Sequence, residues 1–202
     1  MIDLGNGSRY GLFLLPAILL GGFATLFPGF ASMNALALAN GHWWTLWTGH
    51  FLHWTTGHLI WDWSLFMICL MFLAKGGWRV WGWIVVGLPI LGIGIWLARP
   101  EMWEYRGLSG IDTVLFVRVA MGFYGYRKWL PLSGLGLKIA YEFLTVQTIF
   151  SGDLGRNNVP VPEIHMMGLF FGLIWCWASN RNHVTDRQHE HLIPSKSIPA
   201  EA

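Results

Sequence analysis

The stretch Tyr105-Arg-Gly-Leu-Ser-Gly-Ile-Asp112 marks the point where a polar loop becomes an apolar helix. It places Ser109, a small residue close to two glycines, at the start of that helix. A second junction, Val159-Pro-Val-Pro-Glu-Ile-His165, places a histidine at the same kind of position. The two junctions predict two apolar helices, each with a chemically useful side chain near its beginning.

The composition around these junctions is typical of an integral membrane protein. Of the 202 residues, 54% are hydrophobic and 12% are charged, whereas soluble domains carry about 25% charged residues. The 14 tryptophans and 13 phenylalanines are typical of apolar segments that end at a membrane interface. Cys69 and Cys176 lie in apolar runs and are expected to be free, buried thiols. The sequence contains no basic stripe, so no nucleic-acid partner is expected, and the lipid bilayer is the expected environment.

Six apolar runs predict an all-α integral membrane protein, a bundle of six transmembrane helices. A span needs about 20 apolar residues. Charged residues interrupt the fourth and fifth runs, so we expect neighbouring helices to shield those two. The domain is predicted to cover residues 1–180, and residues 181–202 are predicted to form a polar cytoplasmic tail. The predicted spans are residues 10–30, 58–74, 78–97, 109–125, 134–150 and 161–178.

The basic residues predict the orientation of these spans. Cytoplasmic loops of membrane proteins carry an excess of lysine and arginine. Nine of the 13 basic residues fall on one predicted side, and they are Arg9, Lys75, Arg79, Arg127, Lys128, Lys138, Arg181, Arg187 and Lys196. This bias places both termini in the cytoplasm. It also places His58, Ser109 and His165 at similar depth near the outer face of the membrane.

A serine and a histidine brought together in this way could hydrolyse a peptide bond. Such a reaction needs a nucleophile, a base and donors for the oxyanion. Ser109 is the predicted nucleophile and His165 the predicted base, while the Ser109 amide and His58 are predicted to stabilise the oxyanion. Gly107 and Gly110 would let the chain turn sharply and let a substrate backbone approach. This chemistry requires no metal and no cofactor.

Three alternative interpretations involve these residues or the histidines near them. Ser109-x-x-Asp112 also resembles a helix-capping arrangement, in which the serine side chain has a structural use. His165 in an apolar helix could be a buried histidine that is hydrogen-bonded to a neighbour. The third alternative is a metal or haem site formed by histidines near the outer face, although their spacing is not a zinc signature. These histidines are His42, His50, His53 and His58.

The motifs resemble those of the rhomboid family of intramembrane serine proteases. Gly107-Leu-Ser-Gly110 resembles the family's serine motif, and His165-x-x-Gly168-x-x-x-Gly172 resembles its histidine helix. His53-Trp-Thr-Thr-Gly-His58-Leu-Ile-Trp-Asp62 resembles its second-span motif, and the similarity extends over residues 10–178. Other details resemble the rhombosortase branch, namely Gly49-His-Phe-Leu-His53, Tyr105-Arg-Gly-Leu-Ser-Gly110 and Lys138-Ile-Ala-Tyr-Glu142.

The resemblance implies a function in the bacterial inner membrane. It implies a serine endopeptidase that cuts a transmembrane segment of an exported protein near the outer membrane face, by a Ser109–His165 dyad. The rhombosortase-like details further imply a C-terminal Gly-Gly-type sorting helix as the substrate. Gly168 and Gly172 would let the histidine helix pack closely on the serine helix.

The chain departs from the rhomboid pattern at three places. Asp62 stands where the family usually has asparagine, Thr113 where it often has tyrosine, and Trp44-Thr45 where it has Trp-Arg. An ionised aspartate cannot donate a hydrogen bond to an oxyanion, so Asp62 is expected to be protonated, to point away or to orient His58. These departures keep a second hypothesis open, an inactive rhomboid-like protein that binds transmembrane clients.

Overall fold

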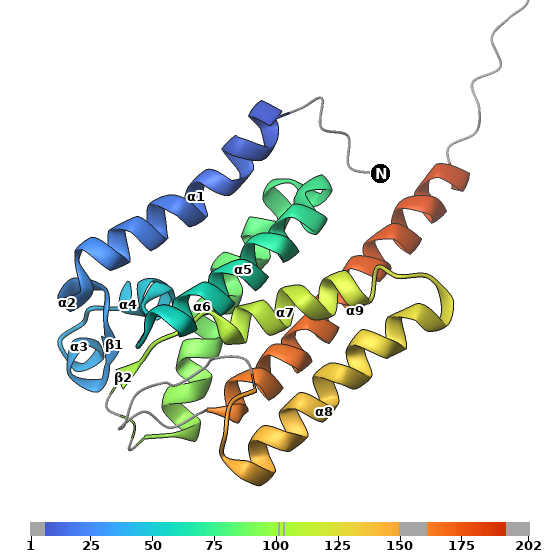
Figure 1. Cartoon of the computed structure of the whole chain (residues 1–202). Coiled ribbons are helices and arrows are strands. Elements are labelled where there is room, and N and C mark those ends of the chain that lie inside the picture. Colours follow the sequence, from blue (N-terminus) through green and yellow to red (C-terminus); the bar gives the residue numbers. More distant parts are fainter. Residues whose placement is uncertain (1–6, 101, 103, 150–160, 193–202) are drawn as a thin grey trace, which may run out of the picture.

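The computed structural model describes residues 7–100, 102, 104–149 and 161–192, and these residues are mostly helical (Figure 1). Figure 1 shows the helices gathered into one bundle, with short elements between α1 and α5. The α-helices are α1 (Gly7–Leu26), α2 (Pro28–Ala31), α3 (Ala35–Ala39), α4 (Thr45–Thr48), α5 (Thr56–Leu73), α6 (Trp78–Ala98), α7 (Ser109–Ala120), α8 (Trp129–Thr145) and α9 (Pro162–Leu192). The 3₁₀-helices are η2 (Gly49–Phe51), η3 (Ala74–Gly76) and η4 (Gly125–Lys128), and the strands are β1 (Met33–Asn34) and β2 (Glu104–Tyr105).

The prediction of six transmembrane helices is wrong. In the described part of the chain, two helical stretches are long and apolar enough to cross a membrane, Thr56–Gly76 and Trp78–Ala98. The other helices fall short for separate reasons. For α1, the described side chains give only the shorter apolar stretch Gly11–Leu26, while α7 has 12 residues and α8 has 17. Polar residues at both ends shorten the apolar part of α9.

The two candidate spans leave much of their apolar surface outside the protein core. About 28% of the apolar window in Thr56–Gly76 is buried, and 44% of that in Trp78–Ala98. Ile60, Ile68 and Phe72 on α5 are each more than half exposed. A core helix of a soluble protein would bury most of such a surface, so the exposed apolar face favours a membrane.

Helix α7 forms the centre of the bundle. It packs against α5, α6, α8 and α9, and its most extensive contacts are with α9. Ile111, Val114 and Leu115 are completely buried there. The predicted span at 109–125 is therefore a short interior helix that ends at Ala120.

A short antiparallel strand pair ties the first loop to the segment before Ser109. In this pair Met33 lies opposite Tyr105 and Asn34 lies opposite Glu104. The Ser32 hydroxyl also donates a hydrogen bond to the Glu104 carboxylate. The fold therefore contains a small β-sheet that the all-α prediction missed. This sheet anchors the start of residues 106–108, the serine loop, which lead into Ser109.

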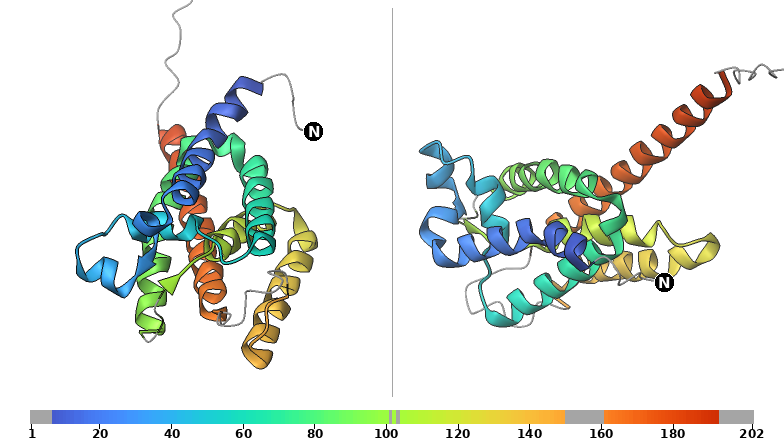
Figure 2. Two further views of the ribbon diagram at one scale, coloured as in Figure 1. Left: turned by 60° about the vertical axis from the view of Figure 1, so that its left-hand side comes forward. Right: turned by 90° about the horizontal axis from the view of Figure 1, so that it is seen from above.

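The last helix runs further than predicted. Helix α9 continues beyond residue 180 to Leu192, and Figure 2 shows it extending away from the other helices. The remainder of the predicted polar tail, residues 193–202, lies outside the described residues. The same holds for residues 150–160, which include Val159 of the histidine junction.

Candidate active site

The serine loop turns sharply at Gly107. This residue has φ = +131°, a backbone conformation that residues other than glycine rarely adopt. A Cβ at this position would lie 3.0 Å from His58 Nε2 and 3.3 Å from Asp62 Oδ2. Glycine therefore lets the backbone before Ser109 rest directly on two side chains of α5, both singled out by the sequence.

Asp62 holds the backbone of the serine loop. The amide N–H of Leu108 donates to Asp62 Oδ2 over 2.8 Å. The same oxygen lies 3.2 Å from His58 Nε2 and 3.3 Å from His53 Nε2. The aspartate, which stands where the resemblance leads one to expect asparagine, thus serves as a buried acceptor beneath Gly107 and Leu108.

Replacing Asp62 tests whether its acceptor oxygen or its charge is required. Asp62→Ala is expected to lower the free energy of unfolding by about 1–3 kcal/mol, because it leaves the buried Leu108 N–H without an acceptor. Asp62→Asn keeps an acceptor oxygen and is expected to retain most of that stability. Chemical unfolding of both variants in mixed detergent measures the difference. An equal loss in the two variants would mean that the negative charge is essential.

The described residues contain one group that could hold a metal ion. The ligand atoms of His53, His58 and Asp62 lie within 4.8 Å of one another. His50 and His42 do not join them, since His50 Nε2 lies 3.0 Å from the Leu88 carbonyl oxygen and His42 stacks on Trp44. The four-histidine metal or haem site is therefore not assembled by this fold.

His50 is a buried neutral histidine with a measurable consequence. Burial lowers the pKa of His50 from 6.5 to about 4. Between these values the unfolded chain binds the extra proton and the folded chain does not, so stability falls as the pH falls. We expect a loss of about 3 kcal/mol between pH 7 and pH 4. Unfolding curves should show a smaller loss for His50→Gln, and an identical pH dependence in this variant would contradict the assignment.

Ser109 is not used as a helix cap. It is the first residue of α7, Leu108 occupies the N-cap position, and no side chain caps the helix. The Asp112 carboxylate has no hydrogen-bond partner among the described residues. The capping alternative predicted a side-chain bond at this helix start, so it loses its main support.

Tyr105 is a neighbour of Ser109 that the sequence did not reveal as part of the site. Its hydroxyl donates to the Gly107 carbonyl oxygen over 3.0 Å and also contacts the Ser109 side chain. Burial raises the pKa of Tyr105, so the phenol remains protonated. Tyr105 therefore closes the serine loop from the side of β2.

Glycines let α9 pack tightly on α7. A Cβ at Gly168 would lie 2.4 Å from the Gly110 carbonyl oxygen, and a Cβ at Gly172 would lie 2.8 Å from Val117 Cβ. A Cβ at Gly110 would lie 2.5 Å from Cγ1 of Ile164, the residue before His165. The three glycines predicted for packing and support thus lie in one contact between the serine helix and the histidine helix.

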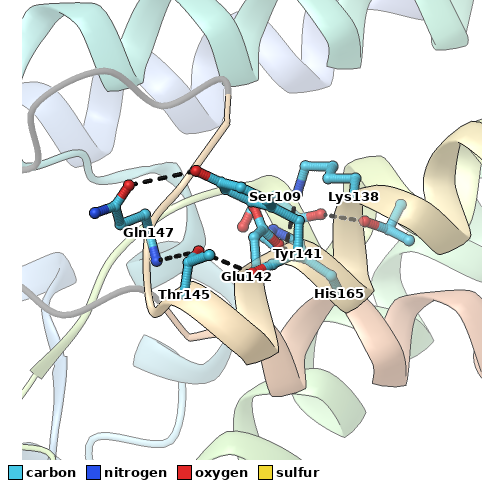
Figure 3. A network of polar contacts seen from close by, with 8 residues as sticks. Ser109, Lys138, Tyr141, Glu142, Thr145, Gln147 and His165 are labelled. Atoms are coloured by element: carbon cyan, nitrogen blue, oxygen red, sulfur yellow. Dashed lines mark hydrogen bonds and ion pairs between the residues drawn. The ribbon is translucent and has the colours of Figure 1, made fainter.

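His165 is held by two charged side chains of α8, as Figure 3 shows. His165 Nδ1 lies 2.6 Å from Glu142 Oε2 and 3.2 Å from Lys138 Nζ. Lys138 Nζ lies 2.7 Å from Glu142 Oε1. His165 and Glu142 are buried, with 6% and 1% of their surfaces exposed. The histidine is therefore embedded in a polar network within an otherwise apolar region.

The contact distances assign the tautomer of His165. One ring nitrogen cannot both donate to a carboxylate and accept from an ammonium. The shorter contact is with Glu142, so Nδ1 carries the proton and donates to that carboxylate, while Lys138 pairs with Glu142. The neutral ring then has its lone pair on Nε2, which is the form that a general base needs.

Glu142 is the residue of the site whose role the sequence did not predict. It appeared in the sequence as one of the charges that interrupt the fifth apolar run, four residues after Lys138. This spacing indicates an ion pair on one helix face. It does not indicate His165, which lies 23 residues further along the chain.

Hydrogen bonds join Asp62 to the backbone of the serine loop, and Glu142 to His165. Among the described residues, no hydrogen bond joins the Ser109 side chain to His165. Asp62 and His58 come from α5, the serine loop from the β2–α7 junction, Glu142 from α8 and His165 from α9. No family model, no curated protein and no solved structure matches the chain.

Proposed function

We propose that the chain is a membrane-associated serine endopeptidase in which Ser109 is the nucleophile and His165 the general base. The observation that carries the proposal is the buried 2.6 Å contact between His165 Nδ1 and Glu142 Oε2. A base that is oriented by a third group is the recurring arrangement of serine hydrolases. The resemblance to rhomboid proteases supports the same pair of residues.

The proposed reaction begins with attack of Ser109 Oγ on a scissile carbonyl carbon. His165 Nε2 takes the serine proton as the bond forms, and the ring becomes positively charged. Glu142 stabilises this charge and keeps the ring in the correct tautomer. The protonated His165 then gives its proton to the leaving amine, which frees the new chain end and leaves an acyl-enzyme for water to hydrolyse.

The start of α7 would supply the oxyanion donors. The first N–H groups of a helix have no acceptor within the helix, and the helix dipole favours negative charge there. Asp62 already accepts the Leu108 N–H, so the Ser109 N–H is the proposed donor. His58 lies against Asp62 and Gly107, and we assign it to supporting this loop.

The two candidate spans support a membrane placement for this chemistry. A three-residue turn, η3, joins α5 to α6, so both flanks of the pair would lie on one side of the membrane. The positive-inside rule puts Lys75 and Arg79 in the cytoplasm, and His58 and Ser109 then lie toward the outer face. We propose a bacterial inner-membrane location. The prediction that both termini are cytoplasmic depended on six membrane crossings, so it no longer has that support.

The substrate that fits this site is a transmembrane helix with glycines near its outer end. An intact helix hides its peptide bonds, and glycine lowers the cost of unwinding it. A C-terminal Gly-Gly-type sorting helix of an exported protein, as the rhombosortase-like motifs imply, has this property.

Co-expression with a reporter that ends in such a helix tests the proposal. The wild-type chain is expected to release the reporter, and Ser109→Ala and His165→Ala are expected to leave it intact. Cleavage that persists in both variants would overturn the assignment of the pair. Binding of the reporter by the wild type without cleavage would favour the inactive, client-binding protein.

A further inference from the structure

A basic pocket lies at the end of the two candidate spans, away from the serine loop. Its volume is about 1100 Å³, and it is formed by the turn between α5 and α6 together with parts of α7 and α9. Three cations line it, namely Lys75, Arg79 and Arg118. No acidic residue lines it among the described residues.

Of these three cations, Arg118 gives the strongest indication of a ligand site. It lies in the last turn of α7, a helix that is otherwise buried in the bundle. Its guanidinium lies 5.9 Å from the centre of the Trp175 ring, and Trp175 stacks on Trp83. In the described part of the chain, no carboxylate forms an ion pair with Arg118, Lys75 or Arg79. The pocket thus concentrates positive charge that no acidic side chain among the described residues neutralises.

The walls of the pocket are apolar and continue along the candidate spans. Phe72 of α5 and Val86 of α6 line it, and each is more than half exposed. Trp78, at the start of α6, is 61% exposed beside the turn, a position typical of interfacial tryptophan. The cations therefore lie where the spans end, and the apolar walls lie where the hydrocarbon would begin.

We propose that this basic pocket binds the phosphate headgroup of an anionic phospholipid. The three cations would contact the phosphate, and the acyl chains would lie along Phe72, Trp83 and Val86. Basic pockets between membrane helices on the cytoplasmic side bind anionic headgroups in this way. The inference rests on the two candidate spans and is independent of the proposed protease activity.

Native mass spectrometry of the full chain in detergent tests this site. Phosphatidylglycerol is expected to bind at least about fivefold more tightly than phosphatidylcholine, since each cation near a headgroup contributes about 1 kcal/mol. Arg118→Gln is expected to lower this preference by about fivefold, the share of one of the three cations, and Arg118→Lys, which keeps the charge, to retain it. Circular dichroism shows whether each variant is folded.

Two controls make the test specific. Arg127→Gln removes an exposed cation of η4 that does not line the pocket, and it is expected to leave the preference unchanged. Glycerol 3-phosphate, which has the headgroup charge without acyl chains, is expected to compete poorly. Equal binding of the two lipids, an equal loss in Arg127→Gln, or displacement of the lipid by equimolar glycerol 3-phosphate would each overturn the proposal.

Discussion

Ser109→Ala is expected to lower the rate of reporter cleavage by at least about 10⁴-fold, because it removes the proposed nucleophile at the start of α7. The substitution removes one oxygen and leaves the α7–α9 contact intact, since that contact is formed by Gly110 and Gly168. The loss should therefore come without unfolding. A fluorophosphonate probe should label the wild type and not the variant.

Ser133→Ala is the matched control for this experiment. Ser133 is an exposed serine on α8, so its loss removes a hydroxyl without touching the candidate site. The control should cleave the reporter and take up the probe like the wild type. Labelling that survives in Ser109→Ala, or that disappears in Ser133→Ala, would show that the probe reacts elsewhere.

Glu142→Gln is expected to lower the rate of cleavage by about 10²–10⁴-fold. Glutamine keeps the size of the side chain, but it cannot stabilise the positive charge that His165 acquires when it takes the serine proton. It can also donate to Nδ1, which would place the proton on Nε2 and remove the base. The expected signature is a lower rate, with substrate binding preserved and the pH profile of the rate shifted. A purely structural role would leave that profile unchanged.

A second glutamate separates this effect from a general loss of charge. Glu163 lies two residues before His165 and pairs with Arg99, with a 2.7 Å distance between Arg99 Nη2 and Glu163 Oε1. Glu163→Gln is expected to change the rate of cleavage by less than about fivefold, because exposed or half-exposed ion pairs contribute about 1 kcal/mol or less. Equal losses in Glu163→Gln and Glu142→Gln would contradict a role for Glu142 in orienting the base. A thermal unfolding curve for each variant shows whether Lys138 without its partner destabilises the fold.

The sequence predicted well those helices that show a long apolar face. The predicted spans at 58–74 and 78–97 differ from α5 and α6 by at most two residues at any end. The prediction from sequence failed for the interior helices, because an apolar run has the same composition whether lipid or protein surrounds it. Helix α7 is surrounded by other helices. Its 12 residues are enough for this interior position, although they are too few to cross a membrane.

The sequence indicated which residue types form the candidate site, but it did not indicate which of these residues contact one another. Glycines around Ser109 indicated a tight turn, and Gly107 does have a positive φ. The backbone partner of Asp62 could not be predicted, because it is the N–H of Leu108, 46 residues away. Pairing of this kind depends on how helices pack, which one sequence without its fold does not specify.

The β1–β2 pair has a consequence for the order in which the protein can fold. Ser32, just before β1, and Glu104, the first residue of β2, are 72 residues apart, so closing this pair costs more chain entropy than any contact within a helix. His165 is synthesised later still, because it lies on α9. During synthesis the serine would therefore be exposed before its base exists, and the chain would acquire its chemistry only when α9 docks. If the proposed protease activity is correct, late assembly of this kind would keep the site inert until the fold is complete.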